Sequence, residues 1–79
     1  MRKTQINWLN VEINRIKVVL AENRKKNKWL AEQIGKNEST VSQWCTNARQ
    51  PSLENLLRIA NALKIDIRNL LYPTNNSES

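Results

Sequence analysis

The sequence predicts an all-α domain, and three observations support this fold class. The 79 residues leave room for a single small domain. Gly and Pro together contribute only three residues, so few positions interrupt a helix. Apolar residues recur at steps of three and four, which is the spacing of one face of an α-helix. We therefore expect five short helices in one domain over 14–72, preceded by an N-terminal extension over 1–13 and followed by a polar tail over 73–79.

The first two helices are expected on either side of a basic run. The first helix is expected over 14–23, on an apolar stripe of four residues that begins one position earlier: Ile13, Ile16, Val19 and Leu20. The basic run over 24–28 then breaks the periodicity. A second helix over 27–34 carries a shorter apolar face of Leu30, Ala31 and Ile34. Gly35, the only glycine, suits the left-handed position that ends a helix, which predicts a sharp turn there.

Three more helices are expected after this turn, each with a recognisable N-cap. Asn37 caps a third helix over 38–46, whose apolar side is Val41, Trp44 and Cys45. After a polar loop that ends in Pro51, Ser52 caps a fourth helix. Its expected apolar face comprises Leu53, Leu56, Leu57, Ile59, Ala60 and Leu63. Asp66 caps a short fifth helix that carries Ile67, Leu70 and Leu71 and is stopped by Pro73.

The composition excludes most enzymatic chemistry. The chain has no His, which removes histidine acid–base catalysis and His-rich zinc sites. One Gly cannot build a dinucleotide-binding loop or a P-loop. Cys45 is the only cysteine, so neither an intrachain disulfide nor a Cys-rich zinc cluster can form. We therefore expect a protein that is not an enzyme and that uses no metal or cofactor.

The charge distribution points to a polyanionic partner. Thirteen Lys and Arg against seven Asp and Glu give a net charge of +6 at pH 7. The excess lies within residues 1–50, with ten basic and four acidic side chains, whereas 51–79 hold three of each. A basic small domain is typical of partners of nucleic acid or anionic membranes, although a solvated basic surface is the simpler alternative. No apolar signal segment or membrane span is evident, so a cytoplasmic protein without membrane contact is expected.

The order of these elements resembles the XRE family, the lambda-repressor-like helix-turn-helix domain. The match runs from about Arg15 to Leu71. It rests on the segments Arg15-Ile16-Lys17, Leu30-Ala31-Glu32-Gln33-Ile34-Gly35, Ser39-Thr40-Val41-Ser42-Gln43-Trp44, Pro51-Ser52-Leu53, Ile59-Ala60, Ala62-Leu63 and Leu70-Leu71. The resemblance implies a five-helix lambda-repressor-like fold with the helix-turn-helix over 27–46.

Three positions depart from the family pattern. Lys25 stands where an apolar residue is usual, and Lys26 stands where Ser or Thr usually caps the second helix. Either Asn27 caps this helix one residue later, or Lys25 and Lys26 are additional phosphate contacts. The loop carries Asn47 in place of a frequent Gly, and Asn also tolerates left-handed geometry.

The resemblance implies that the third helix enters the major groove of DNA. Its outward residues would then read bases: Glu38, Ser39, Thr40, Ser42 and Gln43. Phosphate contacts are expected from Lys26, Asn27, Lys28, Lys36, Asn37, Asn47 and Arg49. An ordinary solvated helix face is the alternative for the same side chains. Arg15 is a weaker candidate, because it can instead form an ion pair within the domain.

Three aromatic and thiol side chains have separate expected roles. Trp44 and Cys45 are expected in the core, Cys45 as a small hydrophobe. Trp29 stands where the family usually has a polar residue. An exposed Trp is costly in so small a protein, so we expect Trp8 or its neighbours to cover it.

The predicted function is a sequence-specific, double-stranded DNA-binding transcriptional regulator of bacterial or phage type, in the first place a repressor. A single domain of this kind reads few base pairs, so a homodimer on a palindromic operator is expected. The alternative is an antitoxin-like module that binds a toxin partner and autoregulates its operon. An RNA-binding domain is a weaker alternative, because aromatic stacking platforms are missing.

Overall fold

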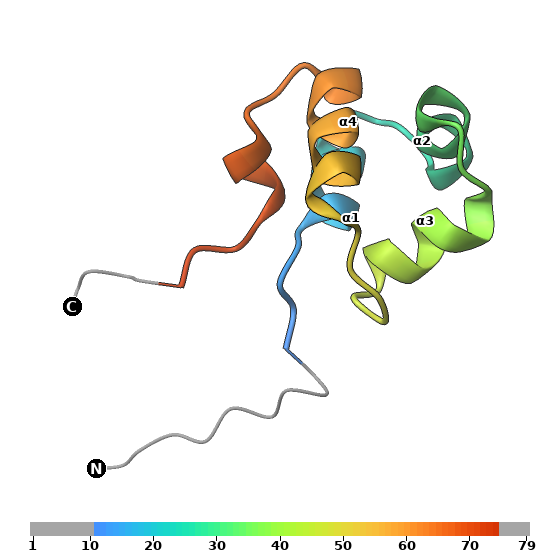
Figure 1. Ribbon diagram of the computed structural model, residues 1–79. Helices are drawn as coiled ribbons and strands as arrows, with labels where there is room; N and C mark the ends of the chain where they lie inside the picture. The colour runs from blue at the N-terminus through green and yellow to red at the C-terminus, as the bar shows by residue number, and fades with distance from the viewer. Residues whose placement is uncertain (1–10, 75–79) are drawn as a thin grey trace, which may run out of the picture.

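The computed structural model describes residues 11–74 and contains four α-helices and one short 3₁₀ helix in that range (Figure 1). They are α1 (Ile16–Glu22), α2 (Asn27–Ile34), α3 (Glu38–Cys45), α4 (Leu53–Leu63) and the 3₁₀ helix η1 (Ile67–Leu70). The all-α class agrees with the prediction, but only four of the five expected helices are α-helices, and the fifth is a 3₁₀ helix. The last element is only four residues long. So short a segment closes too few α-helical hydrogen bonds to offset its nucleation cost, so it forms a tighter 3₁₀ turn.

The helix ends lie where the sequence predicts caps. Three N-cap side chains accept a backbone N–H: Asn37 from Thr40 (2.8 Å), Ser52 from Asn55 (3.1 Å) and Asp66 from Arg68 (2.8 Å). Gly35 ends α2 in left-handed geometry, with φ +72°. The start of α2 excludes one of the two alternatives given for Lys26, the cap at Asn27 one residue later. Lys26 occupies the N-cap position without a side-chain bond and Asn27 is already helical, so a late cap at Asn27 is wrong.

The segment before α1 is extended rather than helical, which shortens α1 from the predicted 14–23. Asn14 forms an isolated antiparallel bridge with Leu71. The N–H of Arg15 donates to the carbonyl of Leu70 at 2.8 Å, and the N–H of Tyr72 donates to the carbonyl of Ile13 at 3.0 Å. The chain that enters α1 is therefore paired with the chain that leaves η1.

All five elements contribute to one apolar core. Its buried side chains are Ile16, Val19, Leu20, Leu30, Ala31, Ile34, Val41, Trp44, Cys45, Leu56, Ile59, Ala60, Leu63 and Leu70. The core positions of Trp44 and Cys45 are thereby confirmed. Leu53 and Leu57 are exceptions, at 78% and 53% exposed, so their assignment to the buried face of α4 was wrong. They stand one helical turn apart on the flank of the stripe, outside the arc that α4 turns toward the core.

The helices pack so that one side of α3 is left uncovered. α2 contacts both α3 and α4, while η1 packs against α4 and against α1. Figure 1 shows α2 and α3 joined by their short turn, with α4 beside them and η1 beyond α4. Among residues 11–74, no helix is long and apolar enough to cross a membrane.

Candidate nucleic-acid interface

The outward face of α3 is polar, and its inward face is fully buried. Val41 is 0% exposed, and Trp44 and Cys45 are buried beside it. With 3.6 residues per turn, burial of these three positions directs the intervening side chains away from the core. Four of the expected base readers are accordingly exposed and one is half-buried: Glu38, Ser39, Ser42 and Gln43, then Thr40.

The turn between α2 and α3 positions this face. Ala31 is buried, and its small side chain lets the two helices approach closely. Gly35 reverses the chain in left-handed geometry, and the N–H of Lys36 donates to the carbonyl of Ala31 at 2.9 Å. This bond closes the end of α2. The exposed Lys36 side chain therefore follows the turn directly and lies next to the start of α3.

An open groove runs between α3 and the start of α4. It is lined by Lys36, Thr40, Gln43, Trp44, Arg49, Gln50, Pro51, Ser52 and Asn55. The structure thus brings together two expected base readers, Thr40 and Gln43, and two expected phosphate contacts, Lys36 and Arg49. Sequence reasoning missed Gln50 and Asn55 as groove residues. The sequence signal that could have found them is their position on either side of Pro51 and Ser52, Gln50 in the connection that passes beside α3 and Asn55 in the first turn of α4.

The basic residues around the start of α2 lie apart from this groove. Lys26 and Lys28 line a separate shallow pocket with Arg24, Lys25, Trp29 and Glu32. The ammonium of Lys25 lies 4.7 Å from the centre of the Trp29 ring, a cation–π contact that partly covers this half-buried indole. The cover expected from Trp8 lies outside the described residues.

Asn27 connects the start of α2 to the end of α3. The Cys45 thiol donates to Asn27 Oδ1 at 3.4 Å. Burial raises the pKa of the Cys45 thiol above 9.0, an effect that the positive charge of Lys17 partly offsets. The thiol therefore remains protonated at neutral pH and can donate. This contact occupies the Asn27 carbonyl oxygen and leaves its amide nitrogen free of protein partners among the described residues.

Asn47 turns away from the groove. It adopts left-handed geometry with φ +62°, as its replacement of a Gly predicts. Its Oδ1 accepts the N–H groups of Ile13 and Asn14 at 2.9 and 3.0 Å, and its Nδ2 donates to the Asn14 carbonyl at 3.0 Å. These bonds commit the Asn47 carboxamide to the fold. The phosphate contact expected from this side chain stays a prediction.

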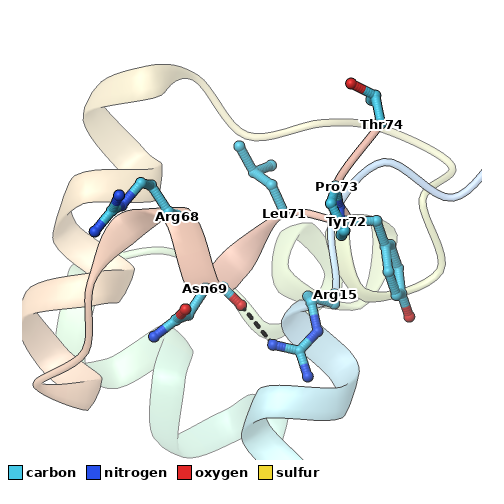
Figure 2. Close-up of a pocket in the computed structure, with 7 residues that line it drawn as sticks. All are labelled: Arg15, Arg68, Asn69, Leu71, Tyr72, Pro73 and Thr74. Atoms are coloured by element: carbon cyan, nitrogen blue, oxygen red, sulfur yellow. Dashed lines mark hydrogen bonds between the residues drawn. The ribbon is translucent and has the colours of Figure 1, made fainter. Parts of the chain in front are cut away.

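Arg15 likewise works within the domain. Its Nη1 donates to the carbonyl of Asn69 at 2.8 Å, and its Nη2 lies 3.5 Å from Glu22 Oε2. Figure 2 shows the guanidinium group beside Asn69 in a shallow pocket that Tyr72 and Pro73 also line. Of the two alternatives for Arg15, the structure supports the ion pair within the domain.

Two helices joined by a glycine turn, the second with an exposed polar face, define a helix-turn-helix DNA-binding domain. The family model described as the Cro/C1-type HTH DNA-binding domain matches residues 15–75. The chain belongs to this family, which confirms the resemblance inferred from its sequence.

Three solved structures are similar to the chain. A protein from Bacteroides fragilis that was assigned as DNA-binding is 55% identical, with a TM-score of 0.74 over 76% of this chain and 97% of its own. The restriction-modification controller protein C.AhdI from Aeromonas hydrophila is 29% identical, with a TM-score of 0.65 over 70% and 83%. The P22 c2 repressor protein, solved with a synthetic operator, is 26% identical, with a TM-score of 0.61 over 67% and 80%. Comparison with curated protein sequences gave no match.

Proposed function

We propose that this chain is a sequence-specific regulator of transcription that binds double-stranded DNA through α3 and acts as a repressor. The observation that carries the proposal is the division of α3 into a buried apolar face and an exposed polar face beside a basic groove. A helix in this setting has the width and the donors and acceptors that the major groove accommodates.

The exposed side chains of α3 differ in what they can read. The amide of Gln43 donates and accepts together, which matches the paired acceptor and donor on the edge of adenine. The carboxylate of Glu38 only accepts, so it suits the amino group of cytosine. The hydroxyl groups of Ser39, Thr40 and Ser42 suit either bases or phosphates. Gln43 is the strongest candidate, because it lines the groove together with the basic side chains of Lys36 and Arg49.

Phosphate contacts are proposed at the start of α2, in the turn between α2 and α3, and in the loop after α3. Lys36 and Arg49 flank the groove, and Lys26 and Lys28 are exposed at the start of α2. Asn27 and Asn37 retain amide donors after their carbonyl oxygens are used within the fold. Such contacts supply affinity and hold the protein in place, whereas base contacts supply the sequence preference.

The similar proteins support a regulatory role. One is named a controller protein and another a repressor that was solved with an operator. One domain of this size contacts few base pairs, so we propose that two copies bind the halves of a palindromic operator. The exposed Leu53 and Leu57 offer apolar surface outside the core to such a pair.

The experiment is a selection of bound sequences from a random duplex library, followed by gel-shift titration of the enriched sequence. A palindromic sequence bound by two copies, and not displaced by the single strand, is expected. Binding that is equal for enriched and scrambled duplexes would contradict the proposal. An antitoxin-like protein would instead show a tight complex with a co-encoded toxin, which co-purification from cells that express both proteins tests.

A further inference from the structure

Asn14 is the only buried polar side chain among residues 11–74, at 2% exposed. Burial of an amide is unfavourable unless its donors and acceptor are all satisfied. Here they are. Its Nδ2 donates to the Trp44 carbonyl at 2.9 Å and to Gln50 Oε1 at 2.8 Å, and its Oδ1 accepts the N–H of Ile16 at 3.0 Å. The Asn14 side chain therefore joins the start of α1 to the end of α3 and to the loop that follows α3.

Asn47 and Gln50 close this arrangement from the loop side. Gln50 Nε2 donates to Asn47 Oδ1 at 3.0 Å, while the Asn47 carboxamide bonds both backbone groups of Asn14. Asn14, Asn47 and Gln50 thus form a closed ring of hydrogen bonds, which the backbone of Asn14 completes. Asn14 lies more than thirty positions from both of the loop residues. We refer to Asn14, Asn47 and Gln50 as the amide ring.

The amide ring holds the loop that carries Arg49. Both neighbours of the Ala48–Arg49 pair, Asn47 and Gln50, are ring members. The N–H groups of Ala48 and Arg49 donate to the carbonyl of Gln43 at 3.0 and 3.2 Å, which ties the same loop to α3. The loop is therefore fixed at both ends, and the Arg49 side chain is left exposed in the groove.

The amide ring also has a rigid support behind it. The residues on either side of Asn14 are paired with 70–72 through the bonds of Arg15 to Leu70 and of Tyr72 to Ile13. Three segments that are remote in sequence therefore meet at Asn14. A loop held in this way loses little additional conformational entropy when it binds, because its geometry is set before the ligand arrives.

From this geometry we infer that Asn14 is a positioning residue for DNA binding: through the amide ring it holds the Arg49 loop against the end of α3, in the orientation in which Arg49 contacts DNA. Asn14 cannot touch DNA itself, because its side chain is buried. The inference rests on the proposed function, and it assigns to this buried residue an effect on the number of phosphate contacts.

The primary test replaces Asn14 by Ser. Asn14→Ser retains an oxygen that can accept the N–H of Ile16 but removes both donors to Trp44 and Gln50. We expect affinity for the selected operator to fall about tenfold, equivalent to about 1.4 kcal/mol. We also expect the slope of log affinity against log salt to decrease by about one per copy, as for loss of one phosphate contact. In the Arg49→Ala background, Asn14→Ser should then have little further effect, because the contact it positions is already absent.

Two controls separate positioning from a general loss of stability. Asn61→Ser makes the same chemical change at an exposed position of α4 and should leave affinity and slope unchanged. Ile59→Val removes one core methylene and should lower the melting temperature without changing the salt slope of DNA binding. Binding is measured at a temperature where circular dichroism shows both Asn14→Ser and Ile59→Val to be folded. Asn47→Gly is the second test variant, because Gly keeps the left-handed backbone while removing the carboxamide.

The outcomes are distinct. If wild type binds its operator and both Asn14→Ser and Asn47→Gly behave like Ile59→Val, the ring serves stability alone and the inference is overturned. Additive effects of Asn14→Ser and Arg49→Ala would overturn it as well. A wild-type protein without salt-dependent DNA binding would instead overturn the proposed function, and this inference with it.

Discussion

The backbone N–H of Arg49 donates to the carbonyl oxygen of Gln43 at 3.2 Å, so the loop residue and the α3 residue are held in a fixed relation. Their side chains line the same groove. Gln43 has the chemistry of a base reader, whereas Arg49 has that of a phosphate contact. Substitution of each residue should therefore affect DNA binding in different ways.

Gln43→Ala should weaken binding to the selected operator by about 1–3 kcal/mol and relax the preference at one base pair per half-site, with the salt slope unchanged. Arg49→Ala should weaken all duplexes alike and lower the slope by about one per lost contact. Salt titrations of both variants on the operator and on a scrambled duplex provide the measurement. Equal weakening of both duplexes by Gln43→Ala would show that Gln43 does not read a base.

Binding to DNA should depend strongly on salt, because exposed Lys26, Lys28, Lys36 and Arg49 would displace condensed counterions. If a dimer neutralises about 6–10 phosphates, affinity should fall about 10³–10⁵-fold between about 50 and 200 mM salt. Fluorescence anisotropy of a labelled operator over this range measures the slope. A flat response would be incompatible with DNA as the partner.

The left-handed geometry of Gly35 should make this position sensitive to backbone preference rather than to side-chain size. An added Cβ would meet no atom within 4 Å, so the cost of substitution comes from φ +72° alone. Gly35→Ala should reduce the free energy of unfolding by about 1 kcal/mol, Gly35→Val by more and Gly35→Asn by less. Urea denaturation with a constant m-value compares the three. Identical midpoints for Asn and Val would contradict this explanation.

Lys64 offers the reverse case, a stabilising substitution. It ends α4 in left-handed geometry, with φ +59°, and its side chain is exposed. Lys64→Gly should raise the free energy of unfolding by about 1 kcal/mol, because Gly adopts this conformation without strain. Lys64→Ala removes the same charge but keeps the strain, so it serves as the control. A gain shared by both variants would point to charge rather than backbone geometry.

The Asp66–Arg68 pair should make a small, pH-dependent contribution to stability. Hydrogen bonds from the Arg68 side chain, and then from its backbone N–H, hold the pKa of the Asp66 carboxyl below 3.8. Since the folded pKa is depressed, this stabilisation is present above 3.8 and is lost as the pH falls through the folded value. Asp66→Asn keeps a capping side chain without the charge. Its stability deficit relative to wild type should therefore disappear in acid, as thermal melts across this range can show.

Much of the local structure follows from the sequence because it depends on neighbouring residues. Asn37, Ser52 and Asp66 cap helices that begin directly after them, and Gly35 turns the chain at its own position. The polar face of α3 is equally local, because helical periodicity places it opposite Val41 and Trp44 once those two residues are buried. Exposure of the candidate base readers could therefore be predicted from the sequence.

The tertiary structure alone decided which side chains meet across the chain. Nothing near Asn47 in the sequence indicates that its carboxamide binds the backbone of Asn14, 33 residues away. Leu53 and Leu57 are as apolar as Leu56 and lie on the same expected helix face, and only the packing of α4 leaves them outside the core. The physical reason is that caps and helix faces depend on contacts within one or two turns, whereas burial and long-range hydrogen bonds depend on the path of the whole chain.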